Sequence, residues 1–172
     1  IERLLLGDGI ASVQACSADT IWTSYFDEGV FGNRGWSQPI GNCGLRSWGL
    51  DGAARLCFDP GAEIEALADC YALNVSSARS TWLYGYPGFE LAHLRDGRLE
   101  EHWGIPLSGC HAFAVSPGFA LFAGGYDDRR SLTLFELPSD GAPPILLACF
   151  EPLDERGEPM NSDQVTGRGD AL

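Results

Sequence analysis

The chain has 172 residues, of which 45% are hydrophobic and 20% are charged, a balance that excludes a disordered protein and a coiled coil. Its formal net charge of −13 argues against nucleic acids and anionic membranes as partners, because both attract basic surfaces. A small molecule or another protein is therefore the expected partner. No apolar run approaches the roughly 20 residues that a membrane helix needs.

The beginning of the sequence has neither Met nor the pattern of a signal peptide. Residues 1–8 become polar after only a few apolar positions. We therefore expect a processed product or a piece of a longer protein.

The six cysteines, at positions 16, 43, 57, 70, 110 and 149, contain no C-x-x-C pair, so the common zinc and thioredoxin patterns are absent. An even number would allow three disulfides in a secreted protein. Cys16, Cys70 and Cys149 lie inside apolar runs, however, where a free thiol packs as a small hydrophobic group. We expect reduced, structural cysteines and a cytoplasmic protein.

Short apolar runs alternate along the chain with turns rich in glycine and proline, a pattern typical of β structure. Asp-Gly pairs at 51–52, 96–97 and 140–141 recur at intervals of 45 and 44 residues, each between two strand-like runs. Asp-Gly favours the tight turn of a hairpin, because that turn needs positive φ. The predicted strands around the three turns are 45–50, 55–58, 89–94, 98–103, 132–137 and 145–150.

A second phrase, an apolar strand, a small polar turn and another strand, precedes each hairpin at 13–22, 72–83 and 112–122. Four antiparallel strands in about 45 residues form the repeating unit of a β-propeller, a blade. An immunoglobulin-like or jelly-roll sandwich is the alternative, but it predicts no aligned copies with the same turn. The sequence thus predicts an all-β fold of propeller blades, with helix limited to one turn within 62–71.

The predicted units are the end of a preceding blade at 1–8, blades at 9–60, 61–108 and 109–153, and the start of a further blade at 160–172. Three blades do not close a ring, which typically needs four to eight. Further blades or self-association would be needed to complete it.

Several phrases resemble a family of bacterial proteins common in high-GC actinobacteria, whose activity is uncharacterised. The matching phrases are Gly7-Asp-Gly-Ile10, Trp22-x-x-Tyr25-Phe-Asp-Glu-Gly-Val-Phe-Gly-Asn33, Gly44-Leu45 and Asp69-Cys-Tyr-Ala-Leu-Asn-Val75, with shorter ones at 123–126 and 167–170. This resemblance implies a cytoplasmic propeller of nearly twice this length. WD-repeat and gluconolactonase-like propellers are similar in overall design only, because the Gly-His and Trp-Asp signatures are missing.

The strand that begins at Thr20 leads into an acidic loop rich in glycine, and this is the first candidate site. Asp27 and Glu28 are expected at the strand end, facing opposite sides, with Asn33 in the loop that follows. A carboxylate there could bind a ligand or act as a base, or it could hold the loop through backbone amides. The loop to Asn42 is the one long insertion in the repeat, either a binding lip or a structural cap.

The second candidate site is the mouth of the propeller channel. The repeat alignment places Ser12, Tyr71 and His111 at one equivalent position, with Asp69 close by. Cys70, Cys110 and His111 could bind a metal ion, and oxygen ligands from Glu28, Asp69 and Asn74 could bind calcium or magnesium. The alternative is that these cysteines pack inside the sheet; the cofactor is unknown, and a divalent metal is one possibility.

His93 and His102 flank a predicted hairpin and are expected in solvent. The leading hypothesis is a non-catalytic binding or scaffold module that presents the acidic loop and the channel mouth to a ligand or protein. The alternative is a metal-assisted hydrolase or lactonase that uses Glu28, Asp69, Asn74 and His111.

Overall fold

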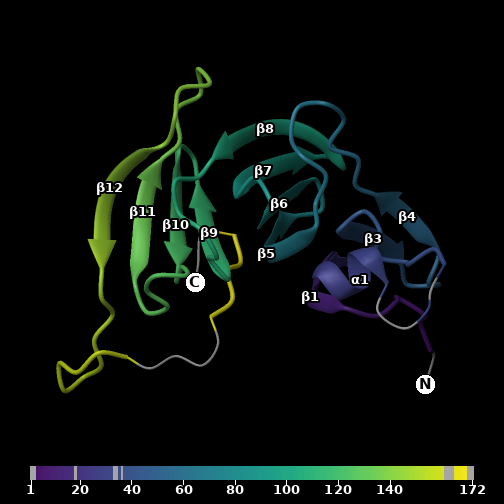
Figure 1. Ribbon diagram of the computed structural model, residues 1–172, viewed down its shortest axis with the longest axis horizontal. Coiled ribbons are helices and arrows are strands. Elements are labelled where there is room, and N and C mark those ends of the chain that lie inside the picture. The colour runs from purple at the N-terminus through teal and green to yellow at the C-terminus, as the bar shows by residue number, and fades with distance from the viewer. Residues whose placement is uncertain (1–2, 18, 33–34, 36, 161–164, 170–172) are drawn as a thin grey trace.

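The computed structural model describes residues 3–17, 19–32, 35, 37–160 and 165–169, and these form three four-stranded antiparallel sheets (Figure 1). Within each sheet the strands follow one another in space in the order of the chain. The first sheet contains β1 (Ile10–Ser17), β2 (Thr20–Tyr25), β3 (Leu45–Gly49) and β4 (Ala54–Cys57). The second contains β5 (Asp69–Ser77), β6 (Ser80–Tyr86), β7 (Glu90–Arg95) and β8 (Arg98–Gly104), and the third contains β9 (Ala112–Ser116), β10 (Phe119–Ala123), β11 (Leu132–Glu136) and β12 (Ile145–Phe150).

The predicted all-β fold is confirmed, and the strands predicted around the three Asp-Gly turns begin and end within one residue of the observed ones. No strand lies in the described residues 3–8, where the end of a preceding blade was expected. The clearest turn joins β7 to β8, where Asp96 and Gly97 have φ values of 51° and 78°. Two successive positive φ values are what a two-residue hairpin turn between twisted strands requires. Local sequence therefore determines this connection.

The sheets pack face to face around their first strands, so that β1 and β9 both contact β5. Figure 1 shows the three first strands towards one side of the molecule and β4, β8 and β12 at its outside. One apolar core fills the space between the first and second sheets, and another lies between the second and third. The middle sheet is thus covered on both faces, and this arrangement fixes which of its residues are buried.

The expected strand end at Asp27 and Glu28 is wrong, because these residues begin a short helix, α1 (Asp27–Phe31). Phe26 is still extended, and its carbonyl accepts hydrogen bonds from the N–H groups of Gly29 and Val30. Both acidic residues therefore lie in the first helical turn, where negative charge is favourable. Five residues are too few to leave a helical period in the sequence.

The expectation of reduced cysteines is wrong for one pair, since Cys43 and Cys57 form a disulfide with Cα atoms 5.8 Å apart. Cys57 ends β4 opposite Arg46 in β3, and Cys43 lies just before β3, so the hairpin brings the two together. Cys70 and Cys110 are free and buried, as predicted. Cys149 is free but exposed, because β12 is an edge strand.

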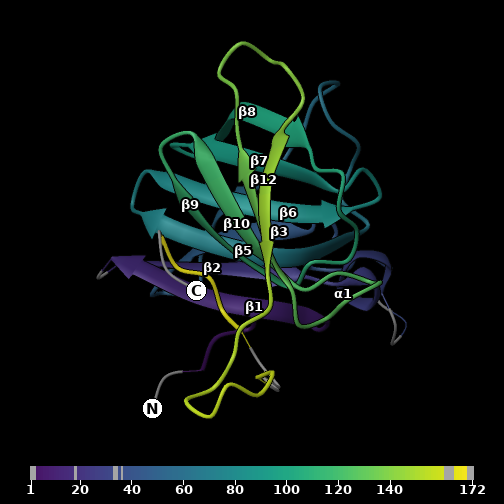
Figure 2. The same ribbon diagram turned by 90° about the vertical axis from the view of Figure 1, so that its left-hand side faces the viewer.

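Figure 2 views the molecule from the side of the third sheet, with β12 in front. The segment 165–169 lies beside β9, where Val115 donates a backbone hydrogen bond to the Gly169 carbonyl. In the described part of the chain, no helix is long and apolar enough to cross a membrane.

Candidate functional site

A cavity of about 550 Å³ opens at the ends of the first strands, and we call it the inner-strand cavity. Ser12 from β1, Tyr71 from β5 and His111 just before β9 all line it. These are the three positions that the repeat aligned, whereas Asp69, Cys70 and Cys110, expected close to them, do not line this cavity. The other lining residues are Ala11, Ala72, Leu73, Gly109, Ala112, Gly125, Tyr126, Arg129, Val165, Thr166 and Gly167.

Two tyrosines form the aromatic wall of the inner-strand cavity. The hydroxyls of Tyr71 and Tyr126 lie 2.5 Å apart, and their rings meet edge to face at 6.2 Å. Tyr71 also stacks on Phe89 at 6.1 Å. Burial, followed by the contact with Tyr126, raises the pKa of Tyr71, so its phenol stays protonated and offers a hydrogen bond rather than a charge.

His111 and Arg129 supply the basic side of the inner-strand cavity. Burial and the charge of Arg129 both lower the pKa of His111, so its imidazole is neutral at pH 7. A Cβ at Gly124 would lie 2.5 Å from the imidazole ring, so only glycine leaves room for it. Arg129 is the one permanently charged side chain among the described lining residues.

Asp69 begins β5 beside the inner-strand cavity without lining it. Burial and then the negative charge of Asp27 raise the pKa of Asp69 to about 6. The structure therefore brings the predicted acids Asp27 and Asp69 within electrostatic range of each other. Glu28 is exposed on α1, and Asn33 lies outside the described residues.

Asn74 is fully buried, and its carboxamide is occupied by backbone groups. It donates to the carbonyls of Phe113 and Gly169 and accepts from the N–H of Gly169. Both polar atoms of this buried amide are therefore engaged by the backbone. Asn74 is thus a structural residue, although the sequence marked it as a candidate ligand.

The predicted metal-ligand sets do not assemble in the described part of the chain. Cys70, Cys110 and His111 do not bring three ligand atoms close together there. In the set of Glu28, Asp69 and Asn74, the carboxamide of Asn74 is already engaged by the backbone. Glu28, Asp69 and His111, which the hydrolase alternative combines with Asn74, do not converge either. Burial raises the pKa of both thiols to about 12, so they stay protonated, whereas a metal ligand must be a thiolate.

A second cavity, of about 440 Å³, lies between the second and third sheets, and we call it the inter-sheet cavity. Its lining includes Trp82, His93, Glu101 and Trp103 from the second sheet and Val115 from the third. His93 is 5% exposed and stacks on Trp82 with ring centroids 3.9 Å apart, so its expected exposure to solvent is wrong.

The burial of His93 was not predicted, because its position beside a predicted hairpin indicated a residue exposed to solvent. β7 is a central strand of the middle sheet, and both of its faces are covered. The run Leu91-Ala-His-Leu94 is buried throughout, which is the signal of a strand with two apolar faces. His102, on the edge strand β8, is half-buried beside Glu90.

No protein-family model matches the chain, and no curated protein matches it either. The resemblance to actinobacterial propeller proteins therefore stays a prediction.

Proposed function

We propose that the chain is a non-catalytic binding module built from β-propeller blades, with the inner-strand cavity as its binding site. Three consecutive four-stranded meanders, whose first strands lie side by side, support the propeller assignment. Each predicted blade at 9–60, 61–108 and 109–153 contains one of the sheets.

One observation carries the proposal: repeat-equivalent positions of three successive sheets meet in one cavity. Ser12, Tyr71 and His111 differ in chemistry although the repeat gives them the same place. If these three positions served only to pack the sheets together, we would expect similar small or apolar residues in all three copies. Three different polar groups facing one space are typical of a ligand site on a regular scaffold.

The chemistry of the lining favours a small ring compound that carries a carboxylate or hydroxyl groups. The Tyr71 and Tyr126 rings offer an aromatic wall with hydroxyls, and neutral His111 offers a nitrogen. Arg129 can pair with an anion that the remaining acidic surface would repel.

The groups around the inner-strand cavity suit binding better than bond breaking. The pKa values of the Tyr71 phenol and of the Cys70 and Cys110 thiols are all raised, which is the opposite of an activated nucleophile. In the alternative of a metal-assisted hydrolase, the backbone already occupies the carboxamide of Asn74, and the described residues Glu28, Asp69 and His111 do not bring three ligand atoms close together.

Ligand-observed NMR with benzoate and glucose as probes tests this proposal. We expect Arg129→Gln to weaken benzoate binding and Tyr126→Ala to weaken both probes. The control is Arg130→Gln, an exposed neighbour of Arg129 that does not line the inner-strand cavity. Probe signals that survive both substitutions, or that fall equally in the control, would contradict the assignment.

The propeller proposal also requires a neighbour for the third sheet. Ile145 and Phe150 of β12 are each about half exposed, and they pair with Glu136 and Leu132 on the face of the third sheet opposite to the buried Phe135. In a ring, such a face packs against the next blade, and we expect further blades or a second copy to cover it. Sedimentation of the 172-residue chain should show concentration-dependent association, and a strict monomer that binds no hydrophobic dye would contradict it.

A further inference from the structure

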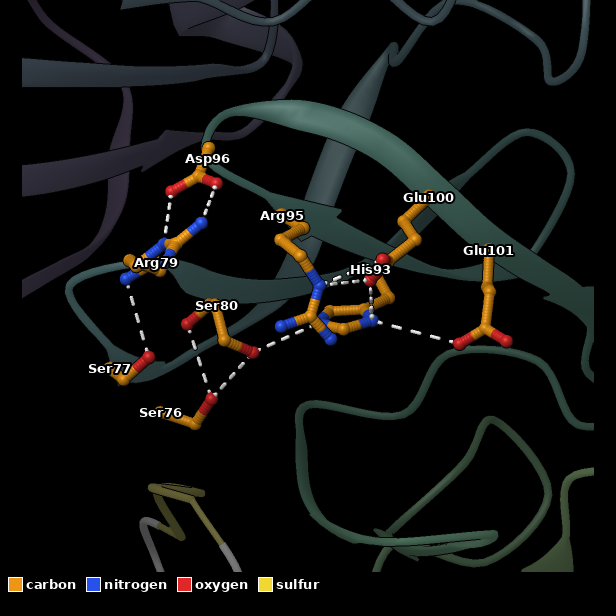
Figure 3. A network of polar contacts seen from close by, with 9 residues as sticks. All are labelled: Ser76, Ser77, Arg79, Ser80, His93, Arg95, Asp96, Glu100 and Glu101. Carbon is orange, nitrogen blue, oxygen red and sulfur yellow. Dashed lines mark hydrogen bonds and ion pairs between the residues drawn. The ribbon is translucent and has the colours of Figure 1, made fainter.

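We propose that His93, Glu100 and Glu101 form a site for a divalent transition-metal ion of the zinc type, at the wall of the inter-sheet cavity (Figure 3). This site shares no residue with the inner-strand cavity. The two proposals therefore stand or fall separately.

A shift in strand pairing places both carboxylates beside one imidazole. His93 in β7 pairs with Glu101 in β8, but the next pair is Leu94 with Leu99, so Glu100 is an extra residue in β8. Such a bulge lets two consecutive side chains reach the same side of a strand. Figure 3 shows the carboxylates of Glu100 and Glu101 converging on the His93 ring.

The distances between these groups fit a shared ion better than hydrogen bonds. His93 Nδ1 lies 3.3 Å from Glu100 Oε2 and 3.8 Å from Glu101 Oε2, and it has no hydrogen-bond partner although it is buried. A hydrogen bond to a carboxylate would measure about 2.7–3.0 Å. Tetrahedral bonds of about 2.1 Å to a central ion hold ligand atoms about 3.4 Å apart, a value that lies between the two distances from Nδ1.

The remaining contacts of His93 orient it as a ligand. Nε2 lies 2.9 Å from Ser80 Oγ, and the ring is stacked on Trp82 with only 8° between the planes. When Nε2 donates to Ser80, the lone pair of Nδ1 faces the two carboxylates, an arrangement that a cation stabilises. A hydrogen bond from the second ring nitrogen is the usual support of a metal-binding histidine.

Charge and ligand type both favour a transition-metal ion. Glu100 and Glu101 bring two carboxylates to the His93 imidazole, and their negative charge attracts a divalent cation. Imidazole together with carboxylates suits zinc, whereas magnesium and calcium take oxygen ligands. His93 and Glu101 also line the inter-sheet cavity, so a free coordination position would open into it and accept water or another oxygen donor.

Arg95 is the internal competitor for this site. Its Nε lies 2.7 Å from both carboxylate oxygens of Glu100, and its side chain is half exposed and able to move away. A guanidinium so close to Glu100 repels an incoming cation. Arg95→Gln should therefore tighten metal binding, a result that a purely structural cluster would not produce.

The test is a titration of the full chain with Zn²⁺ against a chromophoric chelator, supported by the visible spectrum of bound Co²⁺. We expect Glu101→Gln, Glu100→Gln and His93→Gln each to weaken Zn²⁺ binding at least tenfold, and Ser80→Ala to weaken it roughly tenfold through the orientation of His93. Mg²⁺ should not compete at equal concentration.

The matched controls are His102→Gln and Glu90→Gln, which remove the other histidine–glutamate pair of the same strands, 3.6 Å apart. Unchanged affinity in these controls supports the site, as does affinity lost in the ligand variants. Because His93→Gln removes a buried side chain and can unfold the protein, the exposed residues Glu100 and Glu101 decide the outcome. A wild-type chain that binds no Zn²⁺, or a Glu101→Gln variant that binds it equally well, overturns the proposal.

Discussion

The side chain of Asn74 and the backbone of Gly169 hydrogen-bond in both directions. The Gly169 N–H donates to Asn74 Oδ1 at 2.6 Å, and Asn74 Nδ2 donates to the Gly169 carbonyl at 3.0 Å. Nδ2 also donates to the Phe113 carbonyl at 2.9 Å, and the Val115 N–H donates to the Gly169 carbonyl at 2.8 Å. One side chain thus joins β5, β9 and the segment 165–169.

Gln14 in β1 joins the first and second sheets in the same way, but its side chain bonds β5 directly and no further segment of the described chain lies between them. Its Nε2 donates to the Leu73 carbonyl at 2.6 Å, and its Oε1 accepts from the Val75 N–H at 2.9 Å. Gln14 therefore spans both groups of β5 directly. Asn74 is one methylene shorter, and on β9 it bonds only the Phe113 carbonyl. Gly169 provides the second link, because it bonds the Asn74 side chain and accepts a hydrogen bond from the Val115 N–H.

Asn74→Ala should lower the free energy of unfolding by about 2–3 kcal/mol, because it removes the hydrogen bonds of Asn74 to the Phe113 carbonyl and to the Gly169 N–H. Urea unfolding measures the loss. Asn42→Ala, which removes an exposed amide, is the control and should change stability by less than about 0.5 kcal/mol.

The comparison with Gln14 also gives Asn74→Gln a distinct outcome. The longer side chain should reach Val115 directly and displace Gly169. Hydrogen exchange should then stay slow at the Val115 amide and become faster at Gly169. Equal protection at both amides would contradict this account of the two bridges.

The sequence was sufficient for features that depend on local pattern. Asp96-Gly97 determines its own turn, and alternating apolar residues determine the strands, so both could be predicted. The convergence of Tyr71 and His111 also followed, because a repeat places equivalent residues at equivalent points. His93 could not be assigned, since its burial depends on the third sheet covering β7. The Cys43–Cys57 pair likewise depends on the hairpin of β3 and β4, not on the apolar runs that guided the prediction.

Gly29→Ala should destabilise the protein by about 1–3 kcal/mol, although alanine favours a helix over glycine by about 1 kcal/mol. A Cβ at Gly29 would lie 2.6 Å from the Asp8 carbonyl oxygen and 2.8 Å from that of Gly9. Thermal and urea unfolding measure the change. Gly104→Ala is the control, since a Cβ there would have no atom within 4 Å. A stabilised Gly29→Ala variant would show that helix propensity outweighs this contact.

Cys43→Ser should lower the free energy of unfolding by about 3 kcal/mol, the value expected when a loop of about 15 residues is no longer closed by a disulfide. Reduction of the wild-type chain with dithiothreitol should cause a similar loss, and the variant should not respond to it. Cys149→Ser removes a free, exposed thiol and serves as the control. Equal stability of the wild-type chain with and without reductant would contradict the expected effect.

Asp69→Asn should change how stability depends on pH, because burial and then the charge of Asp27 raise the pKa of Asp69 from 3.8 to about 6. The folded protein holds this proton more tightly than the unfolded chain does. The stabilising contribution is therefore complete below about pH 4 and is lost as the pH rises through 6. The variant keeps the shape of the side chain without its charge. The free energy of unfolding of the variant minus that of the wild-type chain should therefore be larger at pH 7 than at pH 4.

Urea unfolding of both proteins between pH 4 and pH 8 measures this difference, which should grow up to about pH 6 and then stay level. Asp27→Asn removes the second cause of the raised pKa, so when Asp69→Asn is made in that background the rise should be smaller and end at a lower pH. Asp127→Asn, in an exposed loop, should leave the profile unchanged. A difference between Asp69→Asn and wild type that stays constant across the whole range would mean that Asp69 titrates alike in the folded and unfolded chains.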